Sequence, residues 1–331
     1  MSIEIRTTDD DQWNDIVDDS PQTTPFHRAE ALDVIAEHSG ADLYRLVGYK
    51  GQEPVGVFPV FSISKGPISG AFSPPPNLKV HYLGPALLNF EKLKRRKRDK
   101  RNQRFVDGVI EWVDEEVSPR YWNLRTPIGY GDARPFTWNE FDASPRYTYV
   151  VDLTRDEDEL LSRFSSDARR NITGEYDVDF EVTEGGLDAI DSIIARTRER
   201  HEEQGESYPV TAEFVRDLHD RLPTGTIRPY VCRVEGEFAG GAIDLESDGR
   251  AGAWIGGAKA DAPVPVNDLL EWRIATDARD RGCSAFDLVG ANHERIYSYK
   301  AKFAPDLVPY FSIERGSTAM TFAAQMYKNL R

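Results

Sequence analysis

The sequence predicts an α/β (α+β) fold made of two similar halves, each with a mixed, mostly antiparallel sheet flanked by helices. Three observations predict it. The chain has 331 residues, a length typical of two domains. Hydrophobic residues make up 40% of them, which is enough for two apolar cores. Strand-like and helix-like patterns follow one order twice, so we expect domains at 1–150 and 151–331.

The first half opens with an alternating strand at 3–6. Two helices follow, at 10–19 and from about 25 to 38, because apolar residues recur there at helical spacing. The elements expected after them are a hairpin at 43–61, strands at 68–72 and 80–83, a helix at 103–117 and a strand at 121–124.

The second half repeats this order from a strand at 180–182. The elements expected after it are helices at 187–202 and 209–222, a hairpin at 230–245, a strand at 253–255, a helix at 267–281 and a strand at 286–288. Two short matches support the repeat, namely the glycine pairs Gly51/Gly56 and Gly236/Gly241 and the strand segments 122–124 and 286–288. Glycine suits a tight hairpin turn and the bulge that follows it.

The two halves join near 144–152. Thr154 and Glu157 follow with the spacing of a capping box, in which the two side chains bond free backbone N–H groups at the start of a helix. This predicts a bridging helix over about 154–175, since the first half has no counterpart.

Charge and cysteine content limit the class of protein. The net charge is −15 and the pI is about 4.9, with 11 lysines against 30 arginines. An acidic, lysine-poor surface is typical of halophilic proteins, and an ordinary acidic enzyme is the alternative. Binding along DNA requires a basic face, so DNA is not an expected partner. Cys232 and Cys283 have no ligand spacing, so we expect buried thiols and no metal site.

We expect a cytoplasmic protein that works at the inner membrane face. The N-terminus lacks the basic and apolar regions of a signal peptide. The longest apolar runs, such as Val55 to Phe61, are too short to span a bilayer.

Three motifs resemble one family. They are Tyr82-Leu83-Gly84-Pro85, Arg169-Arg170-Asn171-Ile172, and Phe286-Asp287-Leu288-Val289-Gly290 followed by Tyr299-Lys300-Ala301-Lys302-Phe303-Ala304. Together with the order of the elements, they resemble the Fem-type tandem GNAT acyl- and aminoacyltransferases over most of the chain. Two positions depart from the family pattern: Tyr299 replaces Phe, and Ala304-Pro305 replaces the usual Gly. The resemblance implies two tandem GNAT-like domains.

The resemblance also implies a function. The expected reaction transfers an acyl or aminoacyl group to an amino group of a cell-surface glycan or peptide precursor. Acyl-CoA or aminoacyl-tRNA would be the donor, with no tightly bound cofactor. The partners implied are that precursor, tRNA or a polyprenyl-phosphate carrier, and the anionic membrane. The glycine-rich loop of simple GNAT enzymes is not evident at 260–265, which weakens the acetyl-CoA alternative.

The resemblance implies that Lys300 stabilises developing negative charge or a donor phosphate, and the alternative is a surface lysine with Lys302 as its exposed neighbour. Asp287 ends a strand and is expected to orient or deprotonate the amine, unless it only bonds the backbone. Arg169 and Arg170 suit bidentate phosphate recognition, or else the end of a helix.

The acceptor is expected to bind near the loop after Asp287. The candidate residues are Asn292, His293, Tyr297, Tyr299 and Trp254, of which Trp254 equally suits core packing.

A basic run at 92–104 stands out in the acidic chain and holds four of the 11 lysines. Its central residues are Lys94, Arg95, Arg96, Lys97 and Arg98. They are expected to contact a phosphate or an anionic carrier, and a solvated loop is the alternative. This run also supports a second kind of function, a non-catalytic module that binds an anionic carrier. A simple acetyl-CoA-dependent enzyme acting on a small amine is the third.

Overall fold

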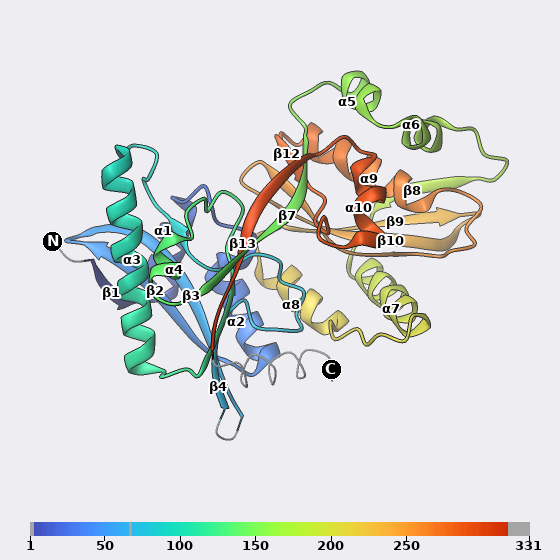
Figure 1. Cartoon of the computed structure of the whole chain (residues 1–331). Helices are drawn as coiled ribbons and strands as arrows, with labels where there is room; N and C mark the ends of the chain where they lie inside the picture. Colours follow the sequence, from blue (N-terminus) through green and yellow to red (C-terminus); the bar gives the residue numbers. More distant parts are fainter. Residues whose placement is uncertain (1–2, 66–67, 317–331) are drawn as a thin grey trace. The chain divides into compact units, whose positions relative to one another are not determined.

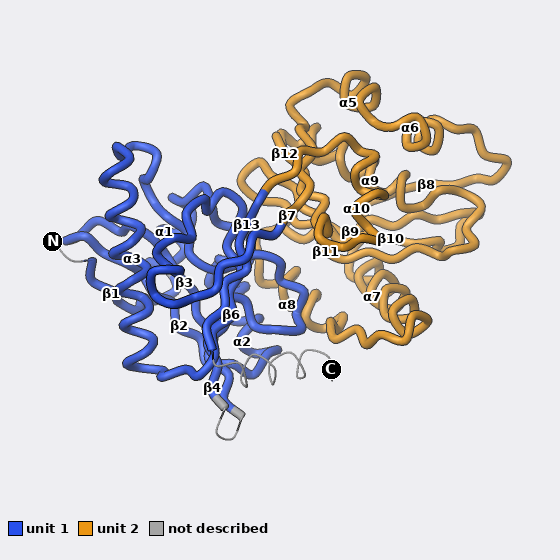
Figure 2. Tube along the Cα trace, viewed as in Figure 1, with its two compact units in different colours: residues 1–146, 309–331 blue, residues 147–308 orange. Residues whose placement is uncertain are grey.

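The computed structural model describes residues 3–65 and 68–316 (Figure 1). The chain forms two compact units (Figure 2). Unit 1 contains residues 1–146 together with the C-terminal residues from 309 onward, and unit 2 contains residues 147–308. The predicted domain boundary at 150 lies close to the first break. The C-terminal strand, however, groups with unit 1 and not with the second half of the sequence.

Unit 1 has the order of elements that the sequence predicts. Its main elements are β1 (Glu4–Thr7), α1 (Asp10–Asp18), α2 (Ala29–Ser39), β2 (Asp42–Lys50), β3 (Glu53–Lys65), β4 (Ile68–Ser73), α3 (Arg95–Glu116) and β6 (Tyr121–Arg125). Three short elements are added, namely the 3₁₀ helix η1 (Pro25–His27), β5 (Ala86–Leu87) and α4 (Arg134–Trp138). In the sheet, the strands lie in the order β1-β2-β3-β4-β6, antiparallel except for the parallel pair β4 and β6.

The long helix α3 covers one face of this sheet through Phe105. Gly48 of β2 and Gly56 of β3 lie opposite each other in the register. A Cβ atom at Gly48 would lie 2.4 Å from the Phe105 ring, and one at Gly56 would lie 2.8 Å from it. The two glycines therefore let the buried ring approach the strands. The other face of β2 meets α2, where Arg45 pairs with Asp33 at 2.6 Å.

Two predictions for unit 1 are wrong. Residues 80–83 form no strand, because the chain there leads into Gly84, whose φ of 67° and close approach to the Arg125 carbonyl oxygen require glycine. The helix predicted from about 103 already begins at Arg95. Residues 95–104 of the basic run are therefore the first part of a 22-residue helix and not a loop.

Unit 2 repeats the same order. Its corresponding elements are β8 (Phe180–Glu184), α7 (Leu187–Glu203), α8 (Ala212–Arg221), β9 (Ile227–Val234), β10 (Glu237–Ser247), β11 (Arg250–Ala258), α9 (Val266–Asp280) and β12 (Ala285–Asp287). Again only the last pair, β11 and β12, is parallel. A Cβ atom at Gly240 would meet Val266 of α9, whereas one at Gly241 would meet Ile193 of α7. The two helices therefore cover opposite faces of the sheet (Figure 1).

Each sheet is completed by a strand that the order of the sequence assigns elsewhere. The strand β13 (Asp306–Gly316) follows the elements of unit 2, yet its residues 312–316 pair antiparallel with β6 of unit 1. The strand β7 (Asp142–Asp152) follows the elements of unit 1, yet its residues 150–152 pair antiparallel with β12 of unit 2. The closing strands of the two units are therefore exchanged.

The segment between β7 and β8 differs from the predicted single helix. It forms α5 (Glu157–Arg163) and α6 (Ser166–Thr173), with Phe164 and Ser165 between them. The N-cap of α5 is Asp156, whose side chain accepts from Glu159 N at 2.8 Å, so the predicted capping box at Thr154 is wrong. Ser165 caps α6 in the same way.

Among residues 3–65 and 68–316, every helix is too short or too polar to cross a membrane. The last element to complete unit 2 is α10 (Glu294–Ala301), which lies between β12 and β13 in the sequence.

His27 is fully buried in unit 1 as a neutral ring. Its Nδ1 accepts from Thr24 N at 3.1 Å, which leaves Nε2–H to donate to the Gly84 carbonyl oxygen at 3.3 Å. Burial lowers the pKa of His27 to about 4. The motif 82–85 therefore supplies a backbone carbonyl to a buried histidine.

We predict that His27 makes stability depend on pH. The unfolded state takes up a proton near the ordinary pKa of 6.5 while the folded state resists it down to about 4. The contribution of His27 to the free energy of unfolding is therefore complete above pH 6.5. It is lost as the pH falls toward 4, and the total loss is about 3 kcal/mol. Urea unfolding of the wild type and His27→Gln at pH 7.5 and 4.5 measures it. The stability difference between them should shrink at pH 4.5, and a difference independent of pH would contradict the assignment.

Candidate active site

The turn after β12 is held by Asp287. Its Oδ1 accepts from the Thr148 hydroxyl at 2.5 Å and from Val289 N at 2.9 Å. Val289 and Gly290 have φ values of 56° and 77°, and a β-branched residue is strained in this left-handed region. Asp287 thus stabilises a strained turn, the backbone-bonding alternative that the sequence left open.

Lys300 lies on α10 beside this turn. Its ammonium group donates to the Leu288 carbonyl oxygen, and a Cβ atom at Gly290 would lie 3.7 Å from its Nζ. An ammonium group has three N–H donors, so the Leu288 bond leaves others for a ligand. The side chain is only partly exposed, which strengthens its interaction with any negative charge that develops next to it.

The loop between this turn and α10 contains two of the expected acceptor residues, Asn292 and His293, and α10 itself contains Tyr297 and Tyr299. Asn292 bonds both backbone groups of Tyr147, accepting at 2.9 Å and donating at 2.7 Å, and so holds the loop against β7. His293 occupies the N-cap position of α10 and is exposed. Tyr297 is 44% exposed. The side chains of Asn292, His293 and Tyr297 are therefore all exposed, and Asn292 is the one that bonds β7.

Lys302 is not the exposed neighbour that the alternative interpretation of Lys300 assumed. Its Nζ lies 2.6 and 2.7 Å from the two carboxylate oxygens of Asp268 on α9, and the two side chains are only 12% and 3% exposed. Asp268 also accepts from Asn171 Nδ2 at 2.6 Å. The Lys302 ammonium stands 4.2 Å from the centre of the Tyr299 ring. Two lysines two positions apart therefore differ in kind, one buried in an ion pair and one beside a turn.

The arginines at 169 and 170 also differ. Arg169 donates from Nη1 to the carbonyl oxygens of Ser162 at 3.0 Å and Phe164 at 2.5 Å, at the end of α5. Arg170 is exposed in the last turn of α6 and has no hydrogen bond or ion pair to any residue that the structure describes. Of the two, Arg170 is available to a phosphate.

Two further predicted positions concern packing. Trp254 on β11 is 8% exposed and contacts Phe214 of α8 edge to face, with ring centres 6.0 Å apart, so it is a core residue. Ala304 adopts a φ of 52°. This left-handed conformation explains why glycine is the usual residue at that place in the motif, and the turn forms here with alanine.

Two acidic side chains of unit 2, the buried Asp244 and the half-buried Glu271, were missed by the sequence reasoning. Asp244 on β10 is 1% exposed, and neither of its oxygens accepts a hydrogen bond from any described residue. Burial, and next the Glu271 carboxyl, raise the pKa of Asp244 well above its usual value. Glu271 on α9 has a buried Oε2 without a partner, and burial raises its pKa too. The available signal was an acid between Ile243 and Leu245 in a strand of small and apolar residues.

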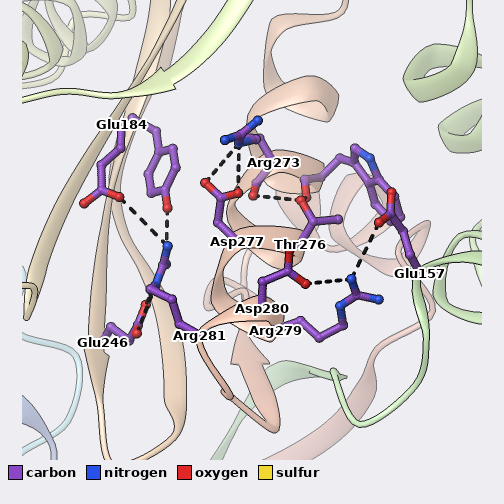
Figure 3. A network of polar contacts seen from close by, with 11 residues as sticks. Glu157, Glu184, Glu246, Arg273, Thr276, Asp277, Arg279, Asp280 and Arg281 are labelled. Atoms are coloured by element: carbon purple, nitrogen blue, oxygen red, sulfur yellow. Dashed lines mark hydrogen bonds and ion pairs between the residues drawn. The ribbon is translucent and has the colours of Figure 1, made fainter.

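A polar network fixes the end of α9 to the sheet (Figure 3). Arg281 donates from Nη2 to Glu246 Oε2 at 2.7 Å and to the Tyr230 hydroxyl at 3.2 Å. Arg228 joins Glu246 at 3.1 Å and Glu184 at 2.7 Å. Because these contacts join the helix end to β8, β9 and β10, they set the orientation of α9 and of the acids it bears.

In unit 1, the basic residues are exposed at the start of α3. Lys94 is its N-cap residue, and Arg95 pairs with Asp99 at 2.8 Å. Arg96, Lys97 and Arg98 have no ion pair within the described part of the chain. Positive charge at a helix N-terminus is unfavourable, so local helix stability does not account for this cluster. Across residues 3–65 and 68–316, no three His, Cys, Asp or Glu side chains are placed to hold a metal ion.

Comparisons with known proteins agree with the fold of the chain. Residues 163–301 match the model of a family described as an acetyltransferase (GNAT) domain, and this segment lies within unit 2. Among curated proteins, no sequence matches the chain.

Three solved structures are similar over nearly the whole chain. FemX has a TM-score of 0.70 at 11% identity and covers 93% of this chain and 96% of its own. The C-terminal domain of a putative lysylphosphatidylglycerol synthetase from Agrobacterium fabrum has a TM-score of 0.57 at 16% identity, covering 95% and 93%. A tandem GNAT protein from the clavulanic acid biosynthesis pathway has a TM-score of 0.54 at 12% identity, covering 96% and 99%. The expected tandem GNAT fold of the Fem type is confirmed.

We predict that the same substitution destabilises the protein to different extents at the two lysines. Lys302→Met leaves Asp268 buried without its cation and should lower the free energy of unfolding by about 3 kcal/mol. Lys300→Met, the matched control, loses only a bond to a carbonyl oxygen and should cost less than about 1.5 kcal/mol. Urea unfolding of both variants at pH 7.5 tests this. Equal losses would show that the two lysines do not differ in this way.

Proposed function

We propose that this chain, an acyltransferase of the GNAT class with the tandem fold of FemX, transfers an acyl or aminoacyl group to an amino group. The amino group belongs to a cell-surface glycan or peptide precursor. The observation that carries the proposal is the position of Lys300. The lysine of the family motif points at the turn after β12, inside the segment that matches the GNAT model, with donors left for a ligand.

The reaction that this arrangement supports is amide formation. The nitrogen lone pair of a neutral amine attacks the carbonyl carbon of the donor, and negative charge develops on the carbonyl oxygen. The Lys300 ammonium stabilises that charge through its remaining N–H donors. The bond to the leaving group then breaks, the leaving group takes up a proton, and the new amide nitrogen releases one. Asp287 supports the step indirectly by holding the turn.

The acceptor is placed over the exposed part of the loop before α10. His293 and Tyr297 offer a hydrogen-bonding and a stacking surface there, as sugar and peptide groups require. Arg170 supplies a free guanidinium group, which fits a phosphate of the precursor or of the donor.

The donor is an acyl thioester or an aminoacyl-tRNA. The GNAT match supports acyl-CoA, whereas the likeness to FemX and to a protein named for lysylphosphatidylglycerol synthesis supports an aminoacyl donor. The same likeness supports work at the inner face of the membrane. No tightly held cofactor is required by either version of the chemistry.

We expect Lys300→Met to lower kcat by about 100-fold or more while the KM for the donor changes little. The assay is acyl transfer in molar KCl, read by mass spectrometry, from acetyl-CoA or lysyl-tRNA to an amino sugar and to a lysine-containing peptide. Thermal unfolding identifies the donor, because a ligand at 100 times its Kd adds about 2.7 kcal/mol of stability.

Retained activity in Lys300→Met would remove this lysine from the mechanism. If neither donor gives a product or a thermal shift, the transferase proposal fails and the non-catalytic binding module remains.

The cations at the start of α3 form a second part of the proposal, a contact with an anionic carrier. A cluster of exposed Lys and Arg side chains on one helix end attracts anionic lipid headgroups, polyprenyl phosphate or tRNA alike. The surrounding protein has a net charge of −15, so attraction to an anion has to come from a local cluster of this kind.

Replacing Arg96, Lys97 and Arg98 with Gln should weaken binding to the anionic partner about tenfold or more, since each cation near a charged surface contributes about 1 kcal/mol. Flotation with phosphatidylglycerol vesicles and a filter-binding assay with tRNA separate the two partners. The control replaces Arg198 and Arg200, exposed cations on α7, with Gln. An equal loss in the control would show general attraction and not a site on α3.

A further inference from the structure

Among the oxygen-bearing side chains of unit 2, three have buried oxygens without a hydrogen bond to any described residue. They are the carboxyl of Asp244 on β10, Oε2 of Glu271 on α9 and the hydroxyl of Tyr299 on α10, which lies next to the Asp268 carboxylate. Asp244 is the most deeply buried, and neither of its oxygens has a hydrogen bond. Buried polar groups in folded proteins are nearly always hydrogen-bonded. Three exceptions in one unit therefore require an explanation.

The three groups belong to elements that contact one another. Helix α9 lies on β10, and its Asp268 forms the ion pair with Lys302, the residue that follows α10. Asp268 and Glu271 are three positions apart on α9, so they share one face of the helix. The Lys302 ammonium that Asp268 holds stands over the Tyr299 ring. Glu271 therefore lies on the side of α9 that faces both Tyr299 and the strand with Asp244.

The electrostatic effects agree with this arrangement. The Glu271 carboxyl contributes to raising the pKa of both Asp244 and Tyr299, after burial itself in each case. Glu246 and Asp287 raise the pKa of Asp244 further, and Arg281 lowers it. Around Glu271, Lys300 and Lys302 lower the pKa while Asp268 raises it. Glu271 therefore interacts electrostatically with both Asp244 and Tyr299.

None of the three nearby cations forms a hydrogen bond or ion pair with the Asp244 or Glu271 carboxyl group. Lys300 donates to Leu288 O, Lys302 pairs with Asp268, and Arg281 pairs with Glu246. A metal ion is also a poor explanation, because the described residues offer no set of three ligands. The missing partner is therefore a hydrogen-bond donor, preferably charged, that none of the described residues supplies.

We propose that Asp244, Glu271 and Tyr299 form a binding site for the primary ammonium group of the acceptor. An ammonium group has three N–H donors and no acceptor, and each of the three residues offers it an unoccupied oxygen. The inference rests on the proposed function, since it names the place where the amine of that reaction binds.

The same site would prepare the amine for attack. One N–H bond of the ammonium breaks, its electron pair stays on nitrogen, and the proton forms an O–H bond with the Asp244 carboxylate. The products are a neutral amine, which is nucleophilic, and a neutral carboxylic acid. A carboxylate whose pKa is raised by burial is a stronger base than an ordinary carboxylate and is suited to this transfer.

The test uses a simple amine, so that it does not depend on the identity of the acceptor. Thermal unfolding of the full chain is measured at pH 7.5 with propylammonium chloride and, at equal ionic strength, with tetramethylammonium chloride, which has no N–H donor. We expect a higher Tm with propylammonium only, and no such shift in Asp244→Asn. Asp248→Asn, which changes an exposed carboxyl in the next turn, should behave as the wild type.

Without any amine, Asp244→Asn should have a higher Tm than the wild type, because it removes a buried carboxyl group without a partner. A lower Tm would show that this carboxyl stabilises the fold, and it would overturn the proposal. Equal Tm shifts with the two ammonium ions, or a propylammonium shift that survives in both Asp244→Asn and Glu271→Gln, would overturn it as well. If Asp244→Asn does not fold, the propylammonium Tm shift of Glu271→Gln decides between these outcomes.

Failure of this site is distinguishable from failure of the proposed function. If acyl transfer occurs but the KM for the amine is unchanged in Asp244→Asn, the function stands and the site does not. If propylammonium binds selectively and no donor yields product, the site stands and the function fails. When both hold, Asp244→Asn should raise the KM for the amine about tenfold or more.

Discussion

The exchange of closing strands is the constraint on which the rest of the structure depends. In each unit the last two strands of the repeated order form the one parallel pair, β4 with β6 and β11 with β12. Without a further strand, the outer strand of each pair, β6 or β12, would leave its backbone N–H and C=O groups unpaired at the edge of the sheet. β13 completes the first sheet and β7 the second. Because β13 has to return to unit 1, the chain between β12 and β13 is held at both ends, and that segment contains Lys300.

Unit 2 treats its buried charges in two ways. Asp268 is satisfied by Lys302 and Asn171, so its ion pair holds α9 against the segment after α10. Asp244 and Glu271, on the same side of the unit, have unsatisfied oxygens. A buried carboxyl without a partner opposes folding, whereas a paired one leaves stability largely unaffected. The contrast separates groups that hold the fold from groups whose partner is absent until a ligand binds.

Much of the fold could be predicted because local patterns report it. Apolar spacing identified the strands and helices of both units in the correct order, and the motif around Lys300 pointed to the turn after β12. The errors share one cause. The strand predicted at 80–83, the capping box at Thr154 and the late start of α3 were read from short runs of residue types. At 80–83 a close approach to the distant Arg125 carbonyl oxygen decided the conformation, and near Thr154 a better cap, Asp156, did so.

The sequence by itself determined the number of units, the order of their elements and the residues of the motif at 286–304. Only the tertiary structure decided which strand closes which sheet, which of Lys300 and Lys302 is buried in an ion pair, which of Arg169 and Arg170 is free, and that Asp244 lacks a partner. The physical reason is the separation along the sequence over which each effect acts. Periodicity and propensity act over a few neighbouring residues, whereas ion pairs, burial and strand pairing join positions far apart, as Asn171 and Asp268 are.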